Sequence, residues 1–235
     1  MPSSFPRRPK MLKGALAVYE QQTPGTQPKL VIFQYNPEQI RRTLATRTPP
    51  ADHGGNSGAA KEEALRAVGP PVETINIAVE LDAADQLEQP SQNQPVVENG
   101  LYPALATLEL LLYPSSIRAE QMEQLARQGE VQLSPADLPL VLLVWGKSRV
   151  VPVQLTNFSV TEEDFDPDLN PTRAKVELGM KVLTYIELTE SSLGRDAFIS
   201  YQKQKEGLAR LHDTDSGPER TSRVLPSGTS LPQAR

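Results

Sequence analysis

The amino-acid sequence predicts a mainly β fold, an antiparallel two-sheet sandwich or barrel with one or two helices. Two observations lead to this prediction. Short segments in which every second residue is apolar recur along the chain, and clusters of Pro, Gly and Asp separate them. Strands and helices do not alternate as they do in βαβ units, so a parallel sheet is not expected.

The N-terminal part of the chain contains a predicted hairpin and two further strands. Residues 13–20 (KGALAVYE) and 29–36 (KLVIFQYN) are short apolar segments joined by a loop rich in Pro, Gly and Thr. Residues 40–47 alternate with a thin apolar face, which indicates a more exposed strand. Residues 73–82 form the clearest half-buried strand, because they alternate cleanly and four apolar residues share one face: Ile75, Ile77, Val79 and Leu81.

The C-terminal part contains two further hairpins. Residues 138–145 and 149–163 are predicted strands joined by a tight turn at Gly146-Lys147-Ser148. The apolar phase slips near Thr156-Asn157, which predicts a β-bulge in the second strand. After a turn at residues 164–171, apolar residues keep even positions as far as Ile186, so a long amphipathic strand follows.

Helical periodicity is limited to three segments. Residues 101–113 place Leu101, Leu105, Leu108 and Leu112 on one stripe before Pro114, which predicts a helix packed on the sheet. Residues 117–127 could continue as a more exposed helix, and residues 195–211 are predicted as a mostly polar one. Residues 48–71 and 86–99 are rich in Pro, Gly or polar residues and are predicted as long loops.

These elements define one core with extensions. We expect a flexible arm over residues 1–10, a β domain over 11–190, a C-terminal helix over 191–212 and a disordered tail over 213–235. Hydrophobic residues make up 38% of the chain and aromatic residues 5%, beside 22 Pro and 14 Gly. The folded part is therefore expected to be smaller than the 235 residues of the chain.

The composition of the chain argues against several classes of function. The chain has no Cys, so it can form no disulfide or thiolate metal site, which suits folding in the cytoplasm. No apolar segment has the signature of a signal peptide or the length of about 20 residues that a membrane-spanning helix needs. The net charge of −5 argues against a general nucleic-acid binder.

The sequence offers no convincing catalytic or cofactor motif. Gly146-Lys147-Ser148 resembles the end of a phosphate-binding loop, but the glycine required five residues earlier is Val141, and a hairpin turn explains it better. Residues 54–58 (GGNSG) are predicted as a flexible tip. The two histidines, His53 and His212, lie in segments without a rigid frame for a catalytic triad or a metal site.

An acidic run is the remaining candidate for chemistry. Its members are Glu162, Glu163, Asp164, Asp166 and Asp168. Their spacing lacks the order and the closing glutamate of an EF-hand, so a solvated turn or a patch for a basic partner is favoured over Ca²⁺ binding. We therefore expect a protein that is not an enzyme, with no catalytic, cofactor-binding or metal-binding residue.

Three stretches of the chain carry a family resemblance. Residues 13–16 (KGAL) lead into residues 32–38 (IFQYNPE), residues 75–82 end in Leu-Asp, and residues 165–174 read FDPDLNPTRA within the segment 153–183. In their order and spacing, over residues 11–188, they resemble the tube-protein family of contractile injection systems, which are phage-tail-like particles. The chain looks closest to the baseplate adaptor or tube-initiator members, without their LysM module.

The resemblance implies a fold and a set of partners. It implies the two-sheet fold of phage tail tubes, closed into a homo-hexameric ring that connects the spike hub to the inner tube and nucleates tube assembly. The implied partners are the chain itself, the spike or hub protein, the inner tube or a second tube initiator, and other baseplate components, in a particle assembled in the cytoplasm. We expect the loop 48–71 and the arm 1–10 to make contacts between subunits or rings.

Two alternatives stay open. The chain could be the inner tube subunit itself, or a β-sandwich module that binds the cell envelope. The second alternative predicts exposed aromatic platforms, whereas the one tryptophan, Trp145, lies in an apolar segment.

Overall fold

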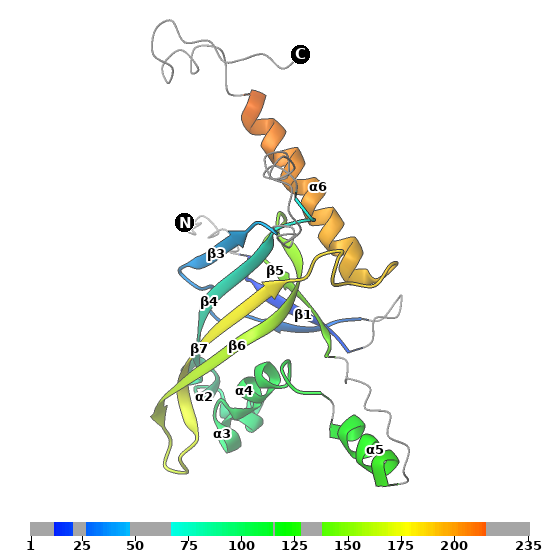
Figure 1. The fold of residues 1–235 in the computed structure, drawn as a ribbon. Helices are drawn as coiled ribbons and strands as arrows, with labels where there is room; N and C mark the ends of the chain where they lie inside the picture. The colour runs from blue at the N-terminus through cyan, green and yellow to red at the C-terminus, as the bar shows by residue number, and fades with distance from the viewer. Residues whose placement is uncertain (1–11, 21–26, 48–66, 115, 128–137, 215–235) are drawn as a thin grey trace, which may run out of the picture.

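The computed structural model describes residues 12–20, 27–47, 67–114, 116–127 and 138–214 of the chain (Figure 1). Several predictions concern other residues and lie outside the described part. These are the arm 1–10, the predicted loop 48–71 as far as residue 66, the predicted tail from residue 215 onward, and His53.

In the described residues, seven strands form one antiparallel sheet in the order β2-β1-β5-β6-β7-β4-β3. Their bounds are β1 (Ala15–Tyr19), β2 (Lys29–Ile32), β3 (Ile40–Ala45), β4 (Val72–Asp82), β5 (Leu140–Val144), β6 (Val150–Phe165) and β7 (Pro171–Val182). The prediction of a mainly β, antiparallel fold is thereby confirmed. The two-sheet sandwich is not confirmed, because these strands belong to a single sheet, which does not close and has β2 and β3 as its edges.

A single long strand, β6, joins the two halves of the sheet. Its first residues pair with β5, and residues 153–165 pair with β7. The register shifts between Leu155 and Asn157, which confirms the predicted bulge. A bulge bends and twists a strand, and side chains from both halves share one core cluster, among them Leu16, Leu143, Ile75 and Met180. This continuity is why seven strands give one curved sheet rather than two.

The predicted apolar faces of β4 and β7 are the faces that are buried. Ile77 of β4 lies opposite Leu178 of β7, and both are at most 4% exposed. Burying such a side chain contributes about 1.5–3 kcal/mol, so this face is a main source of stability. The prediction fails at Ile186, which is 48% exposed. β7 ends at Val182, and the chain then turns, with the backbone N–H of Glu187 donating to Thr184.

Short helices fill the connection between β4 and β5. They are α2 (Ala84–Leu87), the 3-10 helix η1 (Pro90–Gln92), α3 (Gln94–Asn99), α4 (Tyr102–Glu109) and α5 (Ser116–Arg127). The prediction that residues 86–99 form a loop is therefore wrong. Pro90 and Pro95 occupy the first or second position of η1 and α3, where a missing N–H is tolerated, so prolines that suggested a loop begin helices instead.

The predicted leucine stripe packs on the sheet as expected. Leu101, Leu105 and Leu108 are each at most 3% exposed and belong to the main core cluster. The helix α4 ends at Glu109, four residues before the predicted end. The turn that follows buries Leu111 more deeply than Leu112.

The C-terminal helix α6 (Leu193–Thr214) lies where a helix was predicted, but only its first part packs against the sheet. Phe198 and Tyr201 are buried, whereas every residue from Gln202 to His212 is exposed. Figure 1 shows the helix continuing away from the sheet. No helix in the described part of the chain is long and apolar enough to cross a membrane.

A buried carboxylate fastens α6 to the sheet. Glu73 of β4 is 3% exposed and accepts hydrogen bonds from Arg42 Nε at 2.7 Å and Lys205 Nζ at 3.1 Å. Arg42 Nη2 also donates to the hydroxyl of Tyr201 at 3.1 Å, and Lys205 Nζ lies 4.0 Å from the Tyr201 ring centroid. Because a buried charge is costly unless it is paired, this cluster fixes the position of α6 more than it adds stability.

A second carboxylate, Glu187, fastens the turn between β7 and α6. It forms ion pairs with Arg47, which follows β3, and with Lys181 of β7, and it accepts hydrogen bonds from the backbone N–H and the hydroxyl of Thr184. Burial raises the pKa of Glu187, but the hydrogen bonds from Thr184 and the two cations outweigh burial and lower that pKa to about 2.

This shift predicts a pH-dependent loss of stability. A carboxyl group whose pKa is lowered on folding stabilises the protein above its unfolded pKa of 4.5, and that contribution disappears as the pH falls toward 2. Glu187→Gln should lower the free energy of unfolding at pH 7 by at most about 3 kcal/mol, reduced by solvent screening. Urea unfolding at several pH values should show the difference from wild type shrinking below pH 4.5.

The exposed neighbour Glu190 provides the control. Glu190→Gln should change the free energy of unfolding by less than about 0.5 kcal/mol at any pH. A Glu187→Gln variant as stable as wild type at pH 7 would contradict the role assigned to this carboxylate.

Candidate functional site

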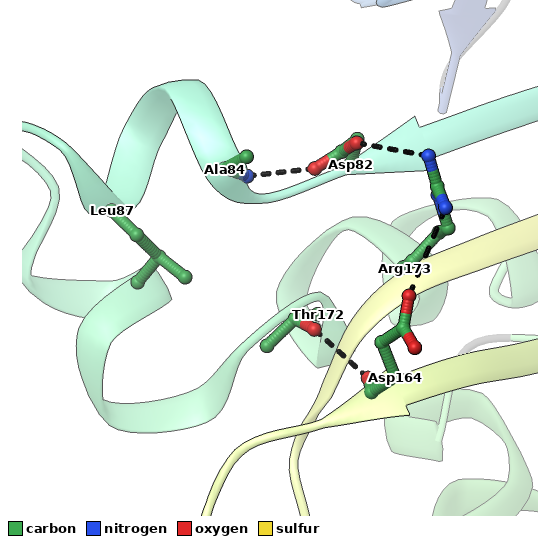
Figure 2. A pocket seen from close by; sticks show the side chains of 6 residues that line it. All are labelled: Asp82, Ala84, Leu87, Asp164, Thr172 and Arg173. Carbon is green, nitrogen blue, oxygen red and sulfur yellow. Dashed lines mark hydrogen bonds and ion pairs between the residues drawn. The ribbon is translucent and has the colours of Figure 1, made fainter.

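Three segments of the chain meet at Asp82, the last residue of β4: the segment after β2, the end of β4 itself, and the hairpin of β6 and β7. Figure 2 shows the contacts between the last two. Gln34 comes from the segment after β2, Asp164 from the end of β6, and Thr172 and Arg173 from the start of β7. These are the same three stretches that carry the family resemblance. We call the group Gln34, Asp82, Ala84, Asp164, Thr172 and Arg173 the Asp82 junction.

The side chain of Gln34 pairs with the backbone of Asp82 as a neighbouring strand would. Its Nε2 donates to the Asp82 carbonyl at 2.7 Å, and its Oε1 accepts from the Asp82 N–H at 2.9 Å. The edge strand β3 pairs with β4 only as far as Ile77, so it leaves the end of β4 without a strand on that side. Gln34 therefore ties the chain after one edge strand to the strand beside the other edge.

A second side-chain amide, that of Asn36, works in the same way. Its Oδ1 accepts from the backbone N–H of Gly14 at 2.8 Å, and its Nδ2 donates to the carbonyl of Leu12 at 2.9 Å. Gly14 is needed here, since a Cβ atom would lie 2.5 Å from the Trp145 ring and 2.8 Å from Phe33. In the Phe-Gln-Tyr-Asn motif, the side-chain amides of Gln34 and Asn36 thus each bind the backbone of another segment, and the ring of Phe33 beside them is buried.

The carboxylate of Asp82 connects two further elements. Its Oδ1 accepts from the backbone N–H of Ala84 at 2.8 Å, which fixes the start of α2, and its Oδ2 lies 3.7 Å from Arg173 Nη2. Arg173 Nη1 lies 3.8 Å from Asp164 Oδ2. Thr172 holds the backbone of Asp164, whose φ of 48° is left-handed, by donating from Oγ1 to its carbonyl at 2.9 Å.

An open hollow of about 350 Å³ lies beside these residues, lined by Asp82, Ala84, Leu87, Asp164, Thr172 and Arg173. Figure 2 shows Arg173 between the two carboxylates. Because the guanidinium is already shared by two carboxylates, the arrangement favours neither an anion nor a metal ion. The described part of the chain contains no group of three or more His, Asp or Glu side chains that could hold a metal ion. The hollow is best explained as a gap left where three structural segments meet, not as a binding site.

The acidic run predicted from the sequence spans the end of β6, with Glu162, Glu163 and Asp164, and the ordered turn that leads to β7, with Asp166 and Asp168. Asp166 Oδ1 accepts from the backbone N–H of Asp168 at 2.9 Å and of Asn170 at 2.8 Å. The side chain of Asn170 donates to Asp166 Oδ2 at 3.0 Å, and this bond is the main cause that lowers the pKa of Asp166. Asp166 therefore builds the turn, while Glu162, Glu163 and Asp168 are exposed.

The other candidates from the sequence are dispersed over the fold. Gly146-Lys147-Ser148 is the predicted turn between β5 and β6, with Gly146 at a φ of 66°. His212 is exposed near the end of α6, on the part that projects from the sheet. Trp145 is half-buried against Gly14. The structure brings none of these residues to the Asp82 junction.

Sequence reasoning missed two residues that organise the structure. Glu73 lies on the buried face of β4, and its place in the alternation with Ile75 and Ile77 was the signal that could have identified a buried carboxylate. The clamp made by Gln34 had no signal in hydrophobic periodicity, because its partner is the backbone of a residue 48 positions away.

Comparison with known proteins gives no identification. No protein-family model matches the chain, and a search of curated proteins finds no match. The family resemblance of the three stretches therefore stays a prediction. The structure shows separately which contacts each stretch makes.

The Gln34 clamp predicts a specific loss of stability. Gln34→Leu keeps the size of the side chain but removes both hydrogen bonds to Asp82, so the free energy of unfolding should fall by about 1–3 kcal/mol. Denaturant unfolding of the variant measures this value. Gln94→Leu is the control, since Gln94 bonds only to the exposed Glu98 on its own helix, and it should cost less than about 0.5 kcal/mol. Equal losses in the two variants would contradict the clamp.

Proposed function

We propose that this protein is a structural subunit of a contractile injection system and forms a ring in the baseplate or inner tube. The ring connects the spike hub to the tube and nucleates tube assembly. The observation that carries the proposal is the open antiparallel sheet, which ends in two edge strands, β2 and β3. An open sheet can continue from one copy to the next, and a closed ring of copies leaves no edge unpaired.

The edge strands have the surface expected of a contact between copies. Leu30 and Ile32 of β2 are 57% and 58% exposed, and Leu44 of β3 is 50% exposed. Monomeric proteins usually protect sheet edges with charged residues or proline, because exposed apolar edges promote association. Burial of these side chains between copies supports ring formation.

The face of the sheet opposite the core suits a wall that contacts water. On β4 and β7 this face carries charges of both signs, including the ion pairs of Lys175 with Glu80 and of Lys181 with Glu187. Charged side chains on such a face are more stable in contact with water than they would be under a second protein layer. This pattern supports a channel lined by the sheets of successive subunits.

The backbone of β2 offers a direct test of edge pairing. The N–H of Phe33 donates inward to Gly14, and in an antiparallel pair the backbone groups of successive residues point to opposite sides. The N–H and carbonyl of Ile32 therefore point away from β1, toward the free edge. A neighbouring copy that pairs with β2 would use these groups.

The proposal predicts a hexamer that depends on this edge. Mass photometry of the wild-type chain should show a species of six times the chain mass of 25.8 kDa. Ile32→Pro removes the outward N–H without breaking a hydrogen bond to β1, so it should convert the hexamer to smaller species while the circular dichroism spectrum stays unchanged.

Two controls separate backbone pairing from loss of apolar surface. Ile32→Thr keeps the N–H and should retain more hexamer than Ile32→Pro. Leu110→Lys changes a leucine that is 62% exposed outside the sheet and should leave the hexamer intact. A wild-type chain that is monomeric at all concentrations, and absent from purified particles, would refute the proposed function.

A further inference from the structure

The helix α4 and the turn after it carry a second apolar stripe, on the side away from the core. Its members are exposed and recur at a spacing of three or four residues: Tyr102, Ala106, Leu110 and Tyr113. We call these four residues the α4 stripe. From Leu101 to Pro114 the only charged residue is Glu109. A helix that is apolar on two sides usually packs on both of them, so the α4 stripe is expected to have a partner.

The helix α5 also exposes an apolar side. Leu125 is 45% exposed, and the polar residues Glu120, Glu123 and Arg127 lie on the opposite side of the helix. In the sequence, the apolar residues at 119, 122 and 126 recur at helical spacing on the side of Leu125. Figure 1 shows α5 standing apart from the sheet and from the helices α2 to α4. The helix α5 therefore does not cover the α4 stripe of its own molecule.

The two apolar surfaces match in length. The 12 residues of α5 span about 18 Å at the helical rise, and the α4 stripe from Tyr102 to Tyr113 spans about 17 Å on the same measure. Within one molecule, only Pro114 and residue 115 separate Tyr113 from α5. Two residues are at the lower limit for a connection between antiparallel helices, and a proline restricts the connection further. The α5 of a second molecule is free of this restriction.

We infer that α5 of one copy packs along the α4 stripe of a second copy. Leu125 then lies against Ala106 and Leu110, while the polar side of α5 stays in contact with water. Leu110 and Tyr113, which are each 62% exposed in the single chain, become buried between the copies. Exchange of a structural element is a common way for identical chains to associate, because it requires no surface beyond those of the chain itself.

This contact goes beyond the proposed ring, because it uses neither of the edge strands β2 and β3. Edge pairing holds a hexamer without it, so Leu110→Lys should leave the hexamer intact and weaken the helix exchange alone. The two proposals can therefore fail separately. A hexamer without helix exchange would contradict only the exchange, and exchange without a hexamer would contradict only the ring.

Cysteine crosslinking tests the exchange directly, since the chain has no cysteine of its own. Ala106→Cys places a thiol on the α4 stripe, and Leu125→Cys, in a second full-length variant with an affinity tag, places one on α5. After co-expression and mild oxidation, the two variants should form a disulfide-linked heterodimer about tenfold faster than either homodimer, because docking raises the local concentration of the two thiols.

The matched control replaces Leu125→Cys by Glu120→Cys, on the opposite side of α5. This variant should form a heterodimer with Ala106→Cys no faster than the homodimers form. Adding Leu110→Lys to Ala106→Cys should lower the heterodimer yield with Leu125→Cys about tenfold, because docking would bury a charge without a partner. Adding Leu110→Met instead should preserve the yield.

A chain that carries both cysteines distinguishes a second copy from the same molecule as the docking partner. Ala106→Cys with Leu125→Cys should give disulfide-linked species of at least twice the chain mass of 25.8 kDa in non-reducing electrophoresis. Monomers closed by an internal disulfide would overturn the inference, because α5 would then pack on its own α4. A heterodimer that forms no faster than in the Glu120→Cys control would overturn it as well.

Discussion

The pairing of the Gln34 side chain with the backbone of Asp82 is the contact on which the shape of the sheet depends. It joins the chain after the edge strand β2 to the end of β4, so the two halves of one continuous sheet are held around a shared core. A true strand at this position would close the sheet. A side-chain amide satisfies the same backbone groups and leaves both edge strands available, and an open but curved sheet is the geometry that can continue into a neighbouring copy.

Two carboxylates fix the position of α6 relative to the sheet. Glu73 of β4 binds Arg42, Tyr201 and Lys205, of which the last two lie on α6, and Glu187 fixes the turn that precedes the helix. The buried charge of Glu73 fixes the position of the helix more than it adds stability, because desolvation cancels much of the attraction. The projecting part of α6 therefore leaves the sheet in a defined direction.

Much of the fold could be predicted from the sequence, because strands and bulges leave a local trace. The alternation around Ile77 and the phase slip at Thr156-Asn157 each depend on neighbouring residues alone. The single sheet could not be predicted, since it depends on β6 pairing with two partners. The helices within residues 86–99 were not predicted, because proline occurs both in loops and in the first turn of helices. The contacts of the Asp82 junction could not be predicted, because they join residues far apart in the sequence, such as Gln34 and Asp82. Only the family resemblance singled out the stretches that contain them.

We propose that copies of this chain assemble through the edges of an open sheet into a ring between spike and tube. Cryo-electron microscopy of particles purified from the native host tests it most directly. The expected result is a sixfold ring at that position, with β2 of each copy beside β3 of the next and the charged face of the sheet toward the channel. A ring in which both edge strands face solvent, or particles that lack this chain, would contradict it.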